Sequence, residues 1–363
     1  MKKVVSFSGG RTSAYLCKVM LEKFGSENVD FVFMDTGAEH PKTYEFIKNV
    51  NDHFNLNLTC LRGDFSLPIG SGVGFRVVHI NDCKPDLKPY KEMMTKYGVP
   101  YIGGMFCTDR MKLKPFKKYC DDKYGKGNYE TWLGIRADEP ARLIGDNAQK
   151  SKSAYKQLLD YGFTNGEITD LYVQLVSGDT KLNEMDSLDE KLTSLISKKI
   201  NYYAKEKIHN MAEISESDKH DVLSFWSKMP FDLGVDEWLG NCVFCPKKSN
   251  LKLAAAQRDE PEIYHDFLEA LNDNSVRIDG KTGVKEQMYR GKKLLQQVVA
   301  MFDGSTGDEI KSRIRGAKMT DTNSCSESCE VFNDDYLKSS IDFDKSQGMS
   351  EFDLADKYGE QRI

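Results

Sequence analysis

The sequence lacks any long run of apolar residues, and this absence limits what the chain can be. No run approaches the roughly 20 residues that a membrane-spanning helix needs. A strong excess of positive charge is also missing: the formal net charge of −5 argues against a protein that coats nucleic acid nonspecifically, although a local basic groove stays open. With 363 residues, 39% hydrophobic and 29% charged, the composition is that of a globular protein with a sizeable core.

The chain also shows no pattern of a secretory signal. Only a few apolar residues separate Lys2 and Lys3 from the first glycines. We therefore expect a cytoplasmic protein. The nine cysteines are an odd number, and without an export signal they indicate reduced thiols or metal ligands rather than a disulfide framework.

The most informative stretch lies at the start of the chain. The apolar residues around Val4 and Val5 predict a short buried strand, the following glycines end it, and a helix begins near Thr12. Such a turn directs backbone N–H groups and the positive end of a helix toward one concavity, which suits an anion. Gly9 and Gly10 let the backbone approach phosphate oxygens closely. The predicted phosphate site consists of Ser6, Ser8, Gly9, Gly10, Arg11, Thr12 and Ser13.

Polar residues follow two further predicted strands. Asp35 and Thr36 come directly after the strand Asp30–Met34, and a carboxylate at that end of an open α/β sheet lies over the ligand crevice. The strand Tyr129–Leu133 leads into a sharp turn at a glycine. Two arginines six residues apart then have the spacing to clamp an anionic group. These residues are Gly134, Arg136 and Arg142.

Cysteines mark a second kind of site. Cys242 and Cys245 have C-x2-C spacing, which lets both bind one metal ion or one cluster. A single such pair does not complete a tetrahedral site, so other ligands must come from elsewhere. The basic segment Met105–Phe116 contains Cys107 and Lys112, and its charges can offset a phosphate, a thiolate cluster or a nucleic-acid backbone.

The connecting segments are predicted from their apolar patterns and turn residues. We expect a strand over Leu56–Leu61, a loop over Gly63–Asp82, a helix over Lys84–Tyr97, a helical pattern over Leu188–Ala212 and a helix start at Ser215-x-x-Asp218.

The phosphate loop resembles the SGGxxS loop of the PP-loop ATP pyrophosphatase, or adenine nucleotide alpha hydrolase-like, superfamily, and it is not a Walker A loop. Four later motifs are similar to the phosphoadenosine phosphosulfate (PAPS) reductase family, particularly its phage and bacterial members. They are D-T-G-x-x-x-P-E-T-Y at 35–44, K-[VL]-x-P-[LF] at 112–116, G-[IL]-R-x-[DE]-[EQ]-S-x-R at 134–142 and G-N-C-x-x-C-x-x-K at 240–248. Lys42 and Pro140 depart from these patterns. The single Cys107 matches neither the cluster-bearing members, which have a Cys-Cys pair, nor those without a cluster.

The resemblance covers roughly residues 3–142 and 230–330 and implies an α/β fold. Its core is a doubly wound, mostly parallel sheet, with a helical insertion and a C-terminal helical region that contains cysteines. We predict a PP-loop nucleotide-binding core over 1–145, a helical insertion over 146–214, the C-terminal part of the core with the C-x2-C metal site over 215–330, and an acidic tail over 331–363.

The resemblance also implies roles for individual residues. Asp35 and Thr36 are expected beside the adenosine of the nucleotide, with Gly134 as a further nucleotide contact. Cys107 is expected to join Cys242 and Cys245. The predicted catalytic residues are Cys107, Lys112, Arg136 and Arg142, and the predicted metal ligands are Cys107, Cys242 and Cys245, with Cys325 or Cys329 as a fourth.

Several metal centres suit these cysteines. We favour a [4Fe-4S] cluster. Zinc stays open as an alternative, since sites with four thiolates serve either metal. A three-cysteine cluster with one open iron remains an alternative that would suit sulfur binding. Magnesium is a further expected ion if the nucleotide is ATP.

The resemblance implies a PAPS reductase-like oxidoreductase or sulfotransferase. In one version adenylyl sulfate is reduced to sulfite. In another, ATP is split between its α and β phosphates to adenylate an acceptor, which then takes up sulfur, as in relatives that thiolate tRNA or DNA. The Ser-Gly-Gly loop is intact here, whereas several PAPS reductases have altered it because they release no pyrophosphate, and this detail favours ATP. A nucleotide- or metal-binding protein without turnover is the third alternative.

The expected small-molecule partner is an adenosine nucleotide, either ATP or adenylyl sulfate. A protein that donates electrons or sulfur, a nucleic-acid substrate and an oligomer all stay open, and no membrane partner is expected. The expected location is the cytoplasm, or the host cytoplasm for a phage-encoded protein.

Overall fold

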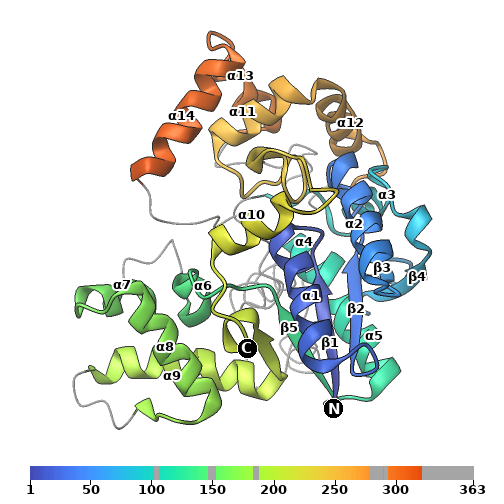
Figure 1. The fold of residues 1–363 in the computed structure, drawn as a ribbon. Coiled ribbons are helices and arrows are strands. Elements are labelled where there is room, and N and C mark those ends of the chain that lie inside the picture. The colour runs from blue at the N-terminus through green and yellow to red at the C-terminus, as the bar shows by residue number, and fades with distance from the viewer. Residues whose placement is uncertain (102–105, 146–152, 183–187, 278–288, 290–292, 321–363) are drawn as a thin grey trace. The chain divides into compact units, whose positions relative to one another are not determined.

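The computed structural model describes residues 1–101, 106–145, 153–182, 188–277, 289 and 293–320. Six strands form one sheet in the order β4-β3-β2-β1-β5-β6 (Figure 1). The pairs β1–β2, β1–β5 and β5–β6 are parallel, whereas β3–β4 is antiparallel. The strands are β1 (Lys2–Phe7), β2 (Val29–Met34), β3 (Thr59–Asp64), β4 (Gly74–Val78), β5 (Tyr129–Leu133) and β6 (Ile208–Asn210). This mostly parallel sheet confirms the predicted α/β class.

β1 is a central strand because its side chains are apolar on both faces. Val4 and Val5 are fully buried, and Val5 lies opposite Phe31 in β2 and Trp132 in β5. Near-continuous apolar runs are typical of parallel strands that are covered on both sides. The carboxyl end of β1 therefore leads the chain directly from the core into the predicted phosphate loop.

The chain divides into two compact units, each built from three segments. The first unit contains Met1–Phe33, Phe46–Leu58 and Cys120–Leu233; the second contains Met34–Glu45, Thr59–Tyr119 and Gly234–Ile363. The division into four consecutive ranges that the sequence suggests stays a prediction, and its last range, 331–363, lies outside the described residues.

The first unit carries the start of the chain and a group of helices. Within it, α7, α8 and α9 pack against one another and α6 packs against α8 (Figure 1). Its helices are α1 (Arg11–Phe24), most of α2 (Pro41–Phe54), the end of α5 (Lys114–Tyr124), α6 (Pro140–Ile144), α7 (Ala154–Asp160), α8 (Asn165–Ser177), α9 (Glu190–Glu206), the short 3-10 helix η4 (Met211–Glu213) and α10 (Lys219–Ser227).

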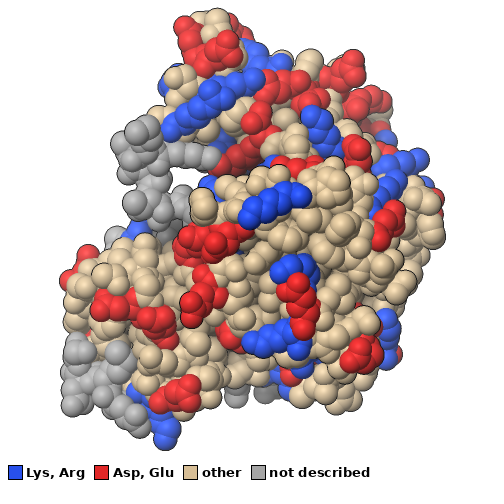
Figure 2. Space-filling model, viewed as in Figure 1, with Lys and Arg blue, Asp and Glu red and all other residues tan. Residues whose placement is uncertain are grey.

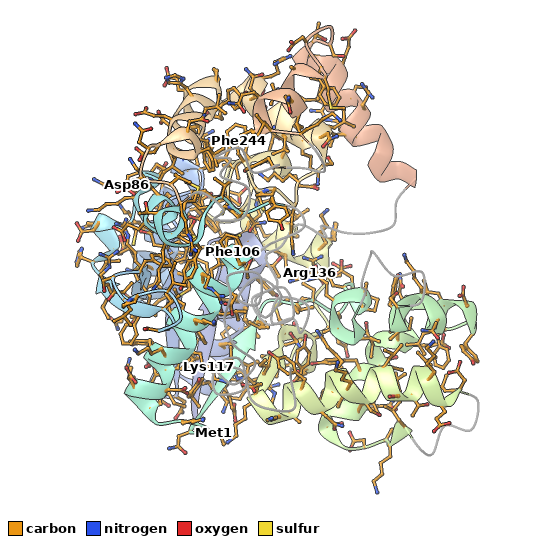
Figure 3. All side chains as sticks on the ribbon, turned by 180° about the vertical axis from the view of Figure 1, so that it is seen from behind. Met1, Asp86, Phe106, Lys117, Arg136 and Phe244 are labelled. Carbon is orange, nitrogen blue, oxygen red and sulfur yellow. The ribbon has the colours of Figure 1, made fainter. Side chains whose placement is uncertain are left out.

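The second unit has its own apolar core, in which Phe106 and Phe244 are fully buried (Figure 3). Its helices include the 3-10 helix η1 (Ile80–Asp82), α3 (Lys88–Tyr97), α4 (Phe106–Thr108), a π-helical turn η2 (Asp109–Leu113), the 3-10 helix η5 (Glu237–Leu239), α11 (Asn250–Asp259), α12 (Pro261–Asn272), α13 (Leu295–Ala300) and α14 (Gly307–Thr320). None of the described helices combines the length and the apolarity that crossing a membrane requires.

Two sequence predictions about strands were wrong. The expected loop 63–82 contains β4, which pairs with β3 in the register Cys60↔Val78, and η1. The flanking glycines hid a short strand that satisfies the backbone groups of β3. The helical pattern over 188–212 ends early, because Lys207 adopts φ 52° and the chain then pairs with β5 as β6.

Three predicted element starts also move. The helix expected from Lys84 begins at Lys88. β3 begins at Thr59 rather than near Leu56, since Asn55 and Asn57 both have left-handed backbone, which asparagine tolerates better than most residues. The helix expected to start at Ser215 begins after Asp218, whose carboxylate accepts the Asp221 N–H in a capping box.

Candidate functional site

The predicted phosphate loop lies between β1 and α1 in the first unit. Gly9 has φ 79°, a conformation that glycine adopts without strain, and Gly10 is the residue before the first helical turn. Ser13 closes the loop: its hydroxyl donates to the Gly10 carbonyl (3.0 Å), accepts the Ser8 N–H (3.2 Å) and lies 2.9 Å from the Ser8 hydroxyl. The strand, glycine turn and helix predicted from the sequence are thus present, and Ser6 is buried at the end of β1.

The start of α1 leaves room for a ligand at Gly10. No side chain among the described residues caps this helix end. A Cβ atom built on Gly10 would meet only the Ser8 hydroxyl, at 3.7 Å, so the space beside this backbone is open. A 14-residue helix whose first N–H groups are not used by a cap presents the donors and the dipole that bind anions.

Gly134 has a packing role at this loop. A Cβ atom there would lie 3.1 Å from Ser13 Cα and 3.2 Å from Ser13 N, which is closer than such contacts normally are. Glycine is favoured here because the turn after β5 passes close to the backbone at the start of α1, and a larger residue would force a shift of a few tenths of an ångström. Whether Gly134 also contacts a nucleotide stays a prediction.

Arg136 reaches the loop from the turn after β5 (Figure 3). Its Nη1 donates to Thr12 Oγ1 at 3.1 Å. The same guanidinium forms a bidentate pair with Asp138, at 2.7 and 3.2 Å. Arg136 is thus positioned beside the phosphate loop, while a neighbouring carboxylate neutralises its charge.

Arg142 and Arg136 share a carboxylate that the sequence did not single out. Glu139 is buried and lies 2.7 Å from Arg142 and 3.4 Å from Arg136, and it also accepts the Arg136 N–H at 3.1 Å. The six-residue spacing therefore brings both arginines to one anion, and in this structure the anion is Glu139. Their predicted role toward a ligand remains a prediction.

Arg11 also has a carboxylate partner, Asp232, from near the end of the first unit. Its Nε and Nη2 each lie 2.6 Å from a carboxylate oxygen. The Trp226 indole donates to the Arg11 carbonyl at 3.0 Å. Sequence reasoning missed Asp232 and Trp226, because nothing in the spacing links positions more than 200 residues apart.

In the second unit, Asp35 is fully buried and its carboxylate is bonded to protein groups. Oδ1 accepts the Gly37 N–H at 2.9 Å and lies 2.9 Å from the Tyr44 hydroxyl, while Oδ2 accepts Arg62 Nε at 2.7 Å. Burial and the nearby Glu39 charge raise the pKa of Asp35, although Arg62 opposes them. The geometry gives Asp35 a clear role in holding its loop; contact with a nucleotide stays a prediction.

Glu39 joins several predicted residues and was itself missed. Its Oε2 accepts the Thr36 hydroxyl at 2.7 Å and lies 2.9 Å from the Tyr44 hydroxyl. Its Oε1 lies 3.7 Å from Lys112 Nζ and 4.0 Å from Cys242 Sγ. Thr36, Lys112 and Cys242, which lie far apart in the sequence, are therefore gathered around one buried carboxylate.

The backbone reinforces this arrangement. Glu39 and Cys242 form an isolated antiparallel bridge, and the Val243 N–H donates to the Ala38 carbonyl at 3.0 Å. The Thr36 hydroxyl also lies 3.7 Å from Cys242 Sγ. The loop that follows β2 is thus directly hydrogen-bonded to the C-x2-C segment within the second unit.

The three predicted metal-binding cysteines lie together. Cys107 and Cys242, both half-buried, pack against the buried Cys245. Two buried tyrosines accompany them: burial raises the pKa of Tyr90 and of Tyr289, and the charges of all three cysteines raise both further. The other two candidates, Cys325 and Cys329, lie outside the described residues.

Lys248 supports the C-x2-C segment from inside the protein. Its side chain is almost fully buried, and Nζ donates to the carbonyls of Val243, at 2.9 Å, and Trp238. The lysine that ends the C-x-x-C-x-x-K motif therefore fixes the backbone between the two cysteines.

The basic residues near Cys107 separate into two groups. Arg110 and Lys112 are buried, and Arg110 pairs with Asp109, whereas Lys117 and Lys118 are exposed. Of these four residues, Arg110 and Lys112 place their charge within the core of the second unit, and the half-buried Lys114 also pairs with Asp109.

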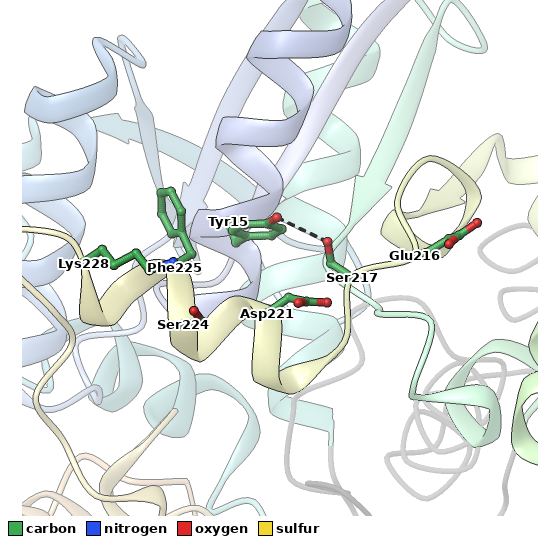
Figure 4. A pocket seen from close by; sticks show the side chains of 7 residues that line it. All are labelled: Tyr15, Glu216, Ser217, Asp221, Ser224, Phe225 and Lys228. Atoms are coloured by element: carbon green, nitrogen blue, oxygen red, sulfur yellow. Dashed lines mark hydrogen bonds between the residues drawn. The ribbon is translucent and has the colours of Figure 1, made fainter.

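Two further features of the first unit lie at α10. A pocket of about 580 Å³ is lined by Tyr15, Glu216, Ser217, Asp221, Ser224, Phe225 and Lys228, and none of the residues predicted for the site is among them (Figure 4). Acidic side chains gather over the N-terminal end of α10 (Figure 2), where Asp218, His220 and Asp221 are exposed and close enough to share a cation. Exposed acidic groups of this kind are common without an ion.

Comparison with known proteins agrees with the loop geometry. The phosphoadenosine phosphosulfate reductase domain model matches residues 2–66. An uncharacterized nin region protein of Escherichia phage lambda, ORF290, is 39% identical over 336 residues, which cover 92% of this chain and 96% of that protein. Two uncharacterized proteins of Methanocaldococcus jannaschii are 26% and 27% identical over 136 and 114 residues, covering 38% and 31% of this chain but only 23% and 21% of those proteins. No solved structure matches significantly.

The sheet and its glycine turn define a nucleotide-binding protein of the PP-loop class. Within that class the chain belongs to the phosphoadenosine phosphosulfate reductase family, and it is similar to the lambda protein over nearly the full length of both. The predicted family is thereby confirmed.

Proposed function

We propose that this chain is an enzyme that binds the phosphates of an adenosine nucleotide at the Ser8–Ser13 loop and carries out sulfur transfer at Cys107, Cys242 and Cys245. The proposal that the loop binds a nucleotide rests on the open space at Gly10, at a helix start that no described side chain caps. Backbone donors at that position suit phosphate oxygens. ATP is the favoured nucleotide, because the intact Ser-Gly-Gly turn suits the pyrophosphate that adenylation releases.

Residues of the first unit would then bind and orient the phosphates. Ser13 holds the loop closed through the Gly10 carbonyl and Ser8. Arg136, fixed against Thr12, would place its guanidinium N–H groups beside the phosphates, while Asp138 and Glu139 balance its charge. Both residues would act mainly by position, which is one of the main contributions a protein makes to phosphoryl and adenylyl transfer.

The sulfur half rests on the packing of three cysteines from two distant segments. Cys107 and Cys242 both pack against Cys245, so the described residues offer three of the four thiolates that a zinc or [4Fe-4S] centre uses. Lys112 and the buried Lys248 add positive charge in the same unit. A [4Fe-4S] cluster is our first choice and zinc the second. When bound, a cluster with an open iron would supply a site for sulfur.

The nucleotide half is tested by calorimetry of the full chain with ATP, adenylyl sulfate and PAPS. We expect ATP to bind and Gly10→Val to abolish binding. Incubation with ATP, sulfide and bulk tRNA should release pyrophosphate. Sulfite formed from adenylyl sulfate, without pyrophosphate from ATP, would instead identify a reductase, and binding without any turnover would identify a nucleotide-binding protein. A chain that binds none of the three would refute the proposal.

The metal half is tested by iron, zinc and acid-labile sulfide contents of anaerobically purified protein. We expect iron with matching sulfide, lost in single serine variants at 107, 242 and 245. Cys17→Ser is the matched control, because Cys17 is a buried residue of α1 in the first unit. The same variants at 325 and 329 identify a fourth ligand. Zinc without acid-labile sulfide would identify a zinc site instead of a cluster. Protein without any metal would contradict the metal site and indicate a pair of thiols.

A nucleic acid is our proposed sulfur acceptor. Basic side chains run along α14 (Figure 2), where Arg313 and Arg315 are exposed. Such residues contact phosphate backbones. Substituting both by Gln should weaken tRNA binding and reduce its salt dependence, while ATP affinity stays constant.

A further inference from the structure

At the phosphate loop, the carboxylate of Asp232 occupies two hydrogen-bond donors of the Arg11 guanidinium. Arg11 directly follows the two glycines and is the first residue of α1. Its Nε and Nη2 each lie 2.6 Å from one oxygen of Asp232. Two parallel N–H···O bonds are also the geometry with which arginine binds phosphate. The carboxylate therefore stands where an anionic ligand of Arg11 would bind.

The backbone on both sides of this pair is held in place. The Trp226 indole donates to the Arg11 carbonyl at 3.0 Å. Phe231, next to Asp232, packs with its ring centroid 5.9 Å from that of Trp226 and 6.1 Å from that of Phe46. The aromatic contacts fix the chain near Asp232, so a change of partner requires only side-chain rotation.

The pair itself is easily opened. The side chains of Arg11 and Asp232 are 26% and 41% exposed, and ion pairs with that much contact with water contribute little to stability. The hydrogen bonds from Arg11 lower the pKa of Asp232, so the carboxylate is charged at neutral pH. A pyrophosphate group carries more negative charge than one carboxylate and would also bind the N–H groups at the start of α1, so it can compete for Arg11.

We propose that Asp232 is a counter-ion that the nucleotide's phosphates displace: Arg11 exchanges the carboxylate for phosphate oxygens on binding, and Asp232 thereby limits affinity for anions with little charge. This inference rests on the proposed nucleotide site. It makes Asp232 a residue that determines specificity through Arg11.

The test measures binding of inorganic pyrophosphate and inorganic phosphate to the full chain by calorimetry at constant ionic strength. Asp232→Asn removes the competing charge and should tighten pyrophosphate binding roughly two- to fivefold, the factor that corresponds to an exposed ion pair. The affinity for phosphate should rise by a larger factor, so the ratio of the pyrophosphate affinity to the phosphate affinity should fall. Asp232→Glu keeps the charge and should bind like the wild type. Glu216→Gln, an exposed carboxylate of the same unit, controls for net charge.

The exchange is isolated with Arg11. Arg11→Met should weaken pyrophosphate binding, and adding Asp232→Asn to it should restore almost nothing, because no guanidinium is left to release. If Asp232→Asn raised the pyrophosphate affinity equally in the wild type and in Arg11→Met, the effect would be one of long-range charge, and the proposed exchange would be wrong. Unchanged or weaker binding in Asp232→Asn, with a wild-type melting temperature, would also overturn it. If the wild type binds neither pyrophosphate nor ATP, the proposed nucleotide site fails, and the pair is structural.

Discussion

The outer ion pairs of the phosphate loop and the polar groups around the cysteines differ in their exposure to solvent. At the phosphate loop of the first unit, the Arg11–Asp232 pair is partly exposed, and Arg136 bonds to a half-exposed carboxylate of its own turn. Around the cysteines of the second unit, Asp35, Glu39 and Lys248 are almost completely buried. The first arrangement suits groups that exchange partners with an anion from solution. The second suits a fixed polar framework.

The difference follows from desolvation. A charge in water gains little from its partner and loses little when the partner changes. A buried charge has already lost its hydration, so removing its partner leaves an uncompensated charge in the core. The comparison therefore predicts that substitutions of the buried charged groups in the second unit mainly change stability, whereas substitutions of the exposed groups at the loop mainly change binding.

The largest effect is expected for Arg62→Met in β3. Arg62 donates to the fully buried Asp35 at 2.7 Å and to the Asp82 carbonyl at 2.9 Å. Removing the guanidinium should lower the free energy of unfolding by about 3–5 kcal/mol, the usual effect of breaking a buried ion pair. Chemical denaturation measures this value.

A matched control lies on the neighbouring strand. Arg76 in β4 is directly opposite Arg62 and pairs with Glu92, but its side chain is 45% exposed. Arg76→Met should change the free energy of unfolding by less than about 1 kcal/mol. Equal losses for the two variants would contradict the distinction between buried and exposed charge.

Lys248→Met should have the next largest effect. It leaves the buried carbonyls of Val243 and Trp238 without the ammonium, which should lower the free energy of unfolding by about 1–3 kcal/mol. Because the Val243 carbonyl lies between the cysteines, the variant should also bind Co²⁺ more weakly, with an altered thiolate-to-metal charge-transfer band. Lys248→Arg should partly restore both values, and Lys247→Met is the adjacent control. An unchanged cobalt spectrum in Lys248→Met would show that Lys248 does not influence metal binding by the cysteines.

Local sequence patterns predicted the elements that carry the loop. The apolar run of β1, the glycines and the following helix are encoded within 24 consecutive residues, and the family motifs placed Asp35, Cys107 and Cys242. β4 and β6 were missed because both are short and owe their formation to backbone pairing with strands elsewhere in the chain.

The missed polar residues have a related cause. Glu39 lies inside a recognised motif, but its importance comes from Lys112 and Cys242, which only the fold brings to it. Asp232 gains its role from Arg11 in the same way. One sequence shows which residue types are present, whereas the partners of a charged group depend on tertiary structure.

Gly134→Ala should have a moderate effect on both stability and binding. The added methyl would lie 3.1 Å from Ser13 Cα, so the turn and the start of α1 must move apart. Overpacking of this kind costs about 1–3 kcal/mol. Because the displaced backbone belongs to the phosphate loop, ATP affinity should fall as well. Gly166→Ala, where the Cβ atom meets nothing within 4 Å, is the control. Normal affinity in a destabilised Gly134→Ala protein would limit this glycine to packing.

The smallest change in stability and the clearest loss of binding should come from Gly10→Val. Gly10 has φ −94° and ψ 160°, an extended conformation that valine adopts without strain, and its Cβ would meet only the Ser8 hydroxyl. Replacing glycine at the residue before a helix destabilises the folded protein by a few tenths to about 1 kcal/mol. The substitution also restricts the unfolded chain, which stabilises the folded protein by a similar amount. The melting temperature should therefore stay near that of the wild type. The two added methyl groups would nevertheless fill the space beside the first N–H groups of α1, and calorimetry should detect no ATP binding. Gly10→Ala should be intermediate. A folded Gly10→Val protein that binds ATP normally would place the nucleotide elsewhere and remove the functional contrast between the two units.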